Sequence, residues 1–92
     1  MTHRSPQKAP SLRPDVRYRV VDGQAVVIVQ EAGEALVLNA VGTRILELVN
    51  GRRSIDEIEE RLGAEFEVEP RELARDVAAY LEELTAAGVV EA

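Results

Sequence analysis

The sequence of 92 residues has no cysteine and no tryptophan, and its single histidine is His3. Without cysteine it can form no disulfide, no thiolate metal site and no cysteine nucleophile. A histidine confined to the N-terminus leaves the folded part without a Ser–His pair or a zinc site built on histidine. The glycine-rich phosphate-binding patterns GxGxxG and GxxxxGK[ST] are missing as well. The sequence therefore predicts no catalytic, cofactor-binding or metal-binding residues, and a protein that is not an enzyme.

Long apolar stretches are also missing. The apolar run Ala25–Val29 has five residues, whereas a membrane-spanning helix needs about 20. Residues 1–14 read MTHRSPQKAPSLRP, a polar stretch with three prolines and without the apolar core of a secretory signal. We expect a cytoplasmic protein with no membrane contact. Its predicted organisation is a disordered N-terminal arm, residues 1–14, followed by one folded domain, residues 15–92.

Acidic residues dominate that domain. Residues 1–20 carry a net charge of +4, whereas residues 21–92 hold sixteen acids against six arginines, a net charge of −10. A surface this acidic is a poor partner for a nucleic-acid backbone. The predicted third helix, residues 70–87, has a net charge of −2, whereas a DNA-recognition helix presents Arg, Lys, Asn or Gln. A winged-helix DNA-binding regulator remains the alternative interpretation of the predicted fold. Because of this acidic charge, however, we expect no nucleic-acid partner.

Three strands are predicted in the first half of the domain. They cover Arg17–Val21, Ala25–Val29 and Glu34–Leu38, and the middle one is β-branched at four of its five positions. Asp22-Gly23 joins the first two strands, a pair typical of tight hairpin turns. Because connections this short cannot cross over a sheet, the strands must form an antiparallel meander.

Helical spacing begins after Asn39, a suitable N-cap residue. A first helix should end at Asn50-Gly51, and a second should open on the capping box Ser54/Glu57 and end near Gly63. Pro70 fits the first turn of a third helix that Gly88 terminates, with Val89-Val90 folding back or adding a short strand. The predicted core stripe of that third helix is Leu73, Val77, Tyr80, Leu81 and Leu84. The fold class is thus α+β: a three-stranded antiparallel meander followed by three helices, similar to a winged helix-turn-helix.

The third predicted strand has an unprotected edge. A meander leaves its outer strands with unpaired backbone groups, which proteins normally guard with charges or proline. Arg17 and Arg19 guard the first strand, whereas Ala35–Leu38 contains neither charge nor proline. Such an edge suits the addition of an extended peptide as a further strand. Two alternatives remain: Val89-Val90 or a helix could cover this edge, or a second copy could pair with it to form a homodimer.

An ordered series of residues in this sequence resembles the PqqD family. The series spans residues 12–91 and comprises Leu38-Asn39, Gly42, Ile45-Leu46-Glu47-Leu48, Gly51, Ser54, Glu57-Ile58, Leu62, Phe66, Val68, Asp76-Val77, Leu81, Leu84 and Gly88-Val89-Val90. The specificity lies in the order and the gaps, because each element alone is common.

The resemblance implies a precursor-peptide recognition element. Such a domain binds the leader of a ribosomally made precursor peptide and presents it to a modifying enzyme, such as a radical-SAM enzyme or a leader peptidase. In that family the leader pairs with the third strand and packs against the third helix. Carried over to this sequence, the peptide-binding residues are Ala35, Leu36, Val37 and Leu38 of the strand and Ala74, Arg75, Ala78 and Tyr80 of the helix.

The sequence also departs from the namesake of that family. It has no Trp, and its segment Val27–Ala32 lacks the proline expected there. It is similar to the recognition proteins of lasso-peptide pathways to the same degree. The resemblance is therefore to a PqqD-like protein that serves an unspecified precursor peptide.

Overall fold

The computed structural model describes residues 9–91. Its elements, in chain order, are β1 (Ser11–Leu12), β2 (Val16–Val21), β3 (Gln24–Val29), β4 (Glu34–Val37), α1 (Ala40–Leu48), α2 (Ile55–Glu65), α3 (Pro70–Ala86) and β5 (Val90–Glu91). The predicted α+β fold, three strands followed by three helices, is confirmed. None of the helices in this part of the chain is long and apolar enough to cross a membrane.

The main sheet is antiparallel, in the order β2-β3-β4. Asp22 and Gly23 both have positive φ, 52° and 77°, as a primed hairpin turn requires. They join β2 to β3 with Val21 opposite Gln24. Strand β4 then pairs with β3, with Val26 opposite Val37. The predicted meander and its Asp-Gly turn are therefore confirmed.

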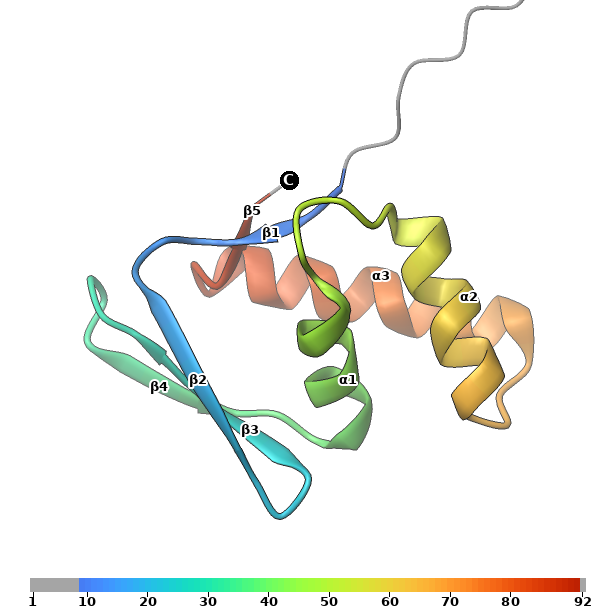
Figure 1. Cartoon of the computed structure of the whole chain (residues 1–92), viewed down its shortest axis with the longest axis horizontal. Helices are drawn as coiled ribbons and strands as arrows, with labels where there is room; N and C mark the ends of the chain where they lie inside the picture. The colour runs from blue at the N-terminus through green and yellow to red at the C-terminus, as the bar shows by residue number, and fades with distance from the viewer. Residues whose placement is uncertain (1–8, 92) are drawn as a thin grey trace, which may run out of the picture.

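Helix α1 packs against β3 on one face of this sheet, and α2 lies beyond α1, away from the sheet (Figure 1). Ala25, Val27 and Val29 of β3 are buried on this helix side, whereas Ile28 points to the open face. On α3 the stripe Leu73, Val77, Leu81 and Leu84 is buried, as predicted, and Tyr80 is partly buried beside it. The domain thus has one core, built almost entirely from aliphatic side chains.

The helix boundaries follow their caps. The Asn39 side chain accepts a hydrogen bond from the Gly42 N–H at 2.9 Å at the start of α1, and the predicted Ser54/Glu57 capping box opens α2. Helix α2 runs two residues past its predicted end near Gly63. The Glu65 carboxylate, in the added turn, binds the Arg44 guanidinium of α1 at 2.7 and 2.8 Å. That hydrogen-bonded pair lowers the pKa of Glu65 and stabilises the last turn.

A second, two-stranded sheet joins the ends of the described chain. Strands β1 and β5 are antiparallel, with Ser11 opposite Glu91, and the Gly51 N–H donates to the Pro10 carbonyl at 2.9 Å. Residues 1–14 were expected to form a disordered arm, but Ser11–Leu12 belong to the fold. The expected disorder of the arm concerns mainly residues 1–8, which lie outside the described residues.

The Thr43 hydroxyl connects β3, β4 and α1. The Leu38 N–H donates to the Ala25 carbonyl at 2.9 Å, but the Ala25 N–H donates to Thr43 Oγ1 at 2.8 Å instead of returning the bond to Leu38. The Thr43 hydroxyl in turn donates to the Leu38 carbonyl at 3.3 Å. Thr43 is buried, so its hydroxyl satisfies two backbone groups that water cannot reach.

We predict that Thr43→Val lowers the free energy of unfolding by about 1–3 kcal/mol, because the buried Ala25 N–H would lose its acceptor while the side-chain volume stays nearly constant. Thr85→Val is the matched control. Its hydroxyl donates to the Leu81 carbonyl within α3, where solvent can replace the bond. Urea unfolding measures both variants, and equal losses would contradict the role assigned to Thr43.

Candidate functional site

The outer edge of β4 is open in residues 9–91. The main sheet ends at β4, and β4 pairs with β3 alone. Strand β5 does not cover this edge, because Val90 pairs with Leu12 in the separate two-stranded sheet. Of the alternatives left open by the sequence, covering of the edge by Val89-Val90 is therefore wrong.

The register shows which backbone groups of β4 face outward. Along an antiparallel pair, residues alternate between those that bond the neighbouring strand and those whose N–H and C=O point away from it. The Leu38 N–H bonds to Ala25 of β3, and Leu36, two residues earlier, stands opposite Val27 in the same phase. The N–H and C=O groups of Ala35 and Val37 therefore point to the free edge.

The side chains of β4 alternate in the same way. Leu38 is buried and Leu36 is half-buried against the core, on the face turned to the helices. Val37 is 64% exposed and points to the opposite face of the sheet. An added strand would therefore meet an apolar wall on the helix side, formed in part by Leu36 and Leu38.

Tyr80 of α3 completes this wall. A β-carbon added at Gly42 would lie 2.8 Å from Tyr80 Cε1 and 3.3 Å from Leu38 Cβ. Both side chains therefore pack over the same point of α1, which needs glycine to leave room for the ring. Tyr80 and Leu38, far apart in the chain, are the predicted site residues that the structure brings together.

At its other end, β4 faces the C-terminus of α3. A hollow of about 330 Å³ opens there between the β3–β4 turn and the end of the helix, and its lining includes Glu34, Ala87 and Gly88. Ala87 is seven residues after Tyr80, so the two occupy one stripe of the helix. We call the edge of β4 from Glu34 to Leu38, together with this stripe of α3, the β4–α3 site.

The other predicted residues of α3 lie on a different flank. Helical spacing places Ala74 and Ala78 on the stripe that leads to Thr85, and Thr85 lines a separate hollow with Ile55 of α2. Arg75 is exposed and lies nearly opposite the buried Val77 in helical phase. The prediction placed all of these beside Tyr80, but the structure separates them from it. Sequence periodicity identifies the buried stripe of α3 but does not show which of the two flanks of that stripe faces β4.

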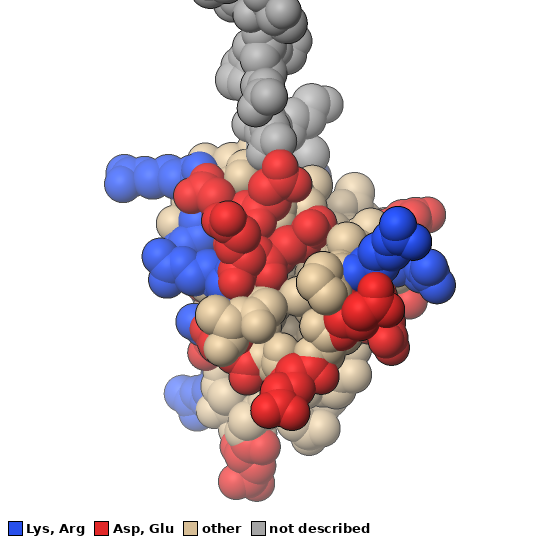
Figure 2. Space-filling view, turned by 90° about the vertical axis from the view of Figure 1, so that its right-hand side faces the viewer, with Lys and Arg blue, Asp and Glu red and all other residues tan. Residues whose placement is uncertain are grey.

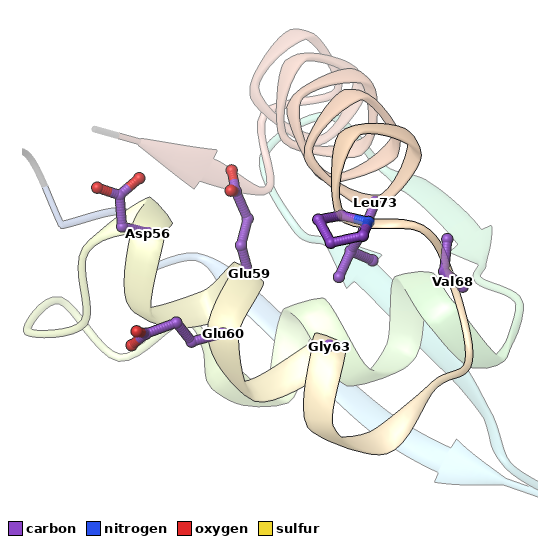
Figure 3. Close-up of a pocket in the computed structure, with 7 residues that line it drawn as sticks. Asp56, Glu59, Glu60, Gly63, Val68 and Leu73 are labelled. Atoms are coloured by element: carbon purple, nitrogen blue, oxygen red, sulfur yellow. The ribbon is translucent and has the colours of Figure 1, made fainter.

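The acidic runs of the sequence form a surface at the far end of the molecule. Acidic side chains spread over the end formed by α2 and the start of α3 (Figure 2). There a hollow of about 500 Å³ has Asp56, Glu59 and Glu60 of α2 on one side and Val68 and Leu73 on the other (Figure 3). Burial of the Glu59 carboxyl, and to a smaller degree the negative charge of Asp56, raises the pKa of Glu59. Residues 9–91 contain no group of three or more His, Cys, Asp or Glu side chains placed to hold a metal ion.

Known structures share this fold. TbiB1 in complex with the TbiA(beta) leader peptide superposes with a TM-score of 0.82 and 26% identity, covering 88% of this chain and 94% of TbiB1. The PqqD truncation of Methylobacterium extorquens PqqCD is a recognition element for ribosomally synthesized and post-translationally modified peptides. It matches with a TM-score of 0.74 and 26% identity over 90% of this chain and 88% of that one.

Sequence comparison agrees with the structural likeness. The PqqA binding protein of Gluconobacter oxydans is 40% identical over 65 residues, which cover 71% of this chain and 68% of that protein. The family model described as coenzyme PQQ synthesis protein D (PqqD) matches residues 24–90. The resemblance seen in the ordered series of residues is thus confirmed, and the chain belongs to the PqqD family.

Proposed function

We propose that this chain binds the leader segment of a ribosomally made precursor peptide by strand addition to β4, and presents the peptide to a modifying enzyme. The observation that carries the proposal is the open edge of β4 beside an apolar wall. Relatives support it, because one is named a PqqA binding protein and a structural neighbour holds a leader peptide.

In this mechanism the main chain and the side chains of the leader have separate roles. Its backbone pairs with the outward N–H and C=O groups of Ala35 and Val37, each hydrogen bond contributing about 0.5–1.5 kcal/mol. Its alternate side chains turn towards Leu36, Leu38 and Tyr80. Burial of those apolar groups contributes about 25 cal/mol per Å², so we expect leaders with an apolar residue at every second position of the paired segment.

The chemistry belongs to a separate enzyme in this proposal. A radical-SAM enzyme or a leader peptidase would act on the core of the precursor while the leader stays on β4, in the cytoplasm where the precursor is made. A second copy of the chain could pair through the same edge, and a homodimer of this kind would compete with the leader.

Proline substitutions at neighbouring positions test the proposed strand addition. Val37→Pro removes an amide that faces the free edge, so it should weaken leader binding by about tenfold or more and leave most of the stability intact. Leu36→Pro removes an amide that faces β3, so it should destabilise the domain instead. Fluorescence polarisation with synthetic Gluconobacter oxydans PqqA and the TbiA(beta) leader, together with thermal unfolding, measures both effects.

Val37→Thr is the control for the loss of the side chain. It keeps the amide, and its side chain points to the open face of the sheet, so the variant should bind nearly as the unmodified chain does. If Val37→Thr and Val37→Pro weakened binding equally, the side chain and not the backbone edge would carry the interaction. Strand addition at β4 would then be the wrong mechanism.

A further inference from the structure

The hollow between the β3–β4 turn and the end of α3 has an excess of negative charge. Its ionisable lining consists of Asp15, Glu31, Glu34 and one cation, Arg13. Arg13 is already shared, with atoms 3.4–3.8 Å from carboxylate oxygens of Asp15, Glu31 and Glu91. Within residues 9–91 no ion pair engages Glu34, so its carboxylate is available to a ligand.

The Asp15 carboxylate adds negative charge to this hollow and is hydrogen-bonded through only one of its two oxygens. Its Oδ2 accepts the Glu31 N–H at 3.2 Å, but its Oδ1 is buried and accepts no hydrogen bond. Arg13 Nε, 3.7 Å away, is too far for one. Because Oδ1 is out of reach of solvent, Asp15 contributes negative charge to the hollow and not a direct contact with a ligand.

Glu83 adds a further carboxylate to this end of the site. It lies on α3 between Tyr80, which packs beside Leu38, and Ala87, which lines the hollow. Residues three and four apart share one face of a helix, so Glu83 faces the β4 side. Its neighbour Glu82 lines the other hollow, beside Ile55, and so lies on the opposite flank of the same helix.

We propose that this hollow is a subsite for a lysine or arginine side chain of the leader, selected by Glu34, Glu83 and Asp15. The inference rests on the proposed function, because the leader strand on β4 is what would bring the side chain to the hollow. A second copy of the chain is a poorer occupant, because the domain beyond residue 20 has a net charge of −10 and would repel itself here.

A displayed library of random 14-residue peptides tests the subsite even though the natural leader is unidentified. Selection on the unmodified chain should enrich lysine and arginine, and selection on Glu34→Lys/Glu83→Lys should lose that enrichment. The matched control, Glu60→Lys/Glu82→Lys, makes the same charge change away from the site and should select the same basic peptides as the unmodified chain. For one selected basic peptide, the Glu34→Lys/Glu83→Lys variant should raise Kd about tenfold at low salt, less at high salt.

Thermal unfolding first verifies that each variant folds, with Glu34→Gln/Glu83→Gln as the substitute if the reversed pair does not. Equal basic enrichment on the site variant and on the control would overturn the subsite while leaving leader binding in place. Selection of apolar peptides that are not enriched in lysine or arginine would also overturn the subsite. If the unmodified chain enriched no peptide at all, the proposed function itself would fail, and the subsite with it.

Discussion

One buried hydroxyl determines how the strands meet the helices. Thr43 Oγ1 accepts a hydrogen bond from the Ala25 N–H, which in a regular antiparallel ladder would donate to the Leu38 carbonyl. The Thr43 hydroxyl donates to that carbonyl instead. The end of β4 is therefore held by α1 as well as by β3. This link adds to the Leu38–Ala25 backbone bond and to the Asn39 cap of α1, and together they hold Leu38 and the start of α1 beneath Tyr80.

The consequence for function is a division between two kinds of recognition. The outward backbone groups of Ala35 and Val37 can pair with almost any extended peptide, because they form hydrogen bonds only with its main chain. In the proposed mechanism, selectivity comes from the residues beside the edge: the apolar wall of Leu36, Leu38 and Tyr80, and the carboxylates at its far end. In the proposed mechanism, a chain of 92 residues with few aromatic side chains binds a peptide without a deep pocket.

Local chemistry made much of the fold predictable from the sequence. The Asp22-Gly23 turn, the Ser54/Glu57 capping box and the buried stripe of α3 each depend on residues close together in the chain. The open edge was predictable from composition, because Ala35–Leu38 lacks the charges and prolines that guard edges. The pairing of Ser11–Leu12 with Val90–Glu91 was not, because it joins two-residue strands from opposite ends of the chain.

Of the proposed β4–α3 site, the sequence alone indicates only the strand side. A stripe of apolar residues shows which face of α3 is buried, but not which flank of that face turns towards β4. That depends on the packing of Tyr80 over Gly42, a contact between distant segments. The outward direction of the Val37 amide similarly depends on the pairing register with β3, which alternation along β4 alone does not reveal.

Hydrogen exchange at individual amides tests strand addition to β4 most directly. In the free chain the Ala35 and Val37 amides should exchange quickly, and the Leu36 and Leu38 amides, which face β3, should exchange slowly. Saturation with a bound leader should slow exchange at Ala35 and Val37 by about tenfold or more, because each gains a hydrogen-bonded partner. Tight binding of the leader with unchanged exchange at both amides would contradict strand addition at β4.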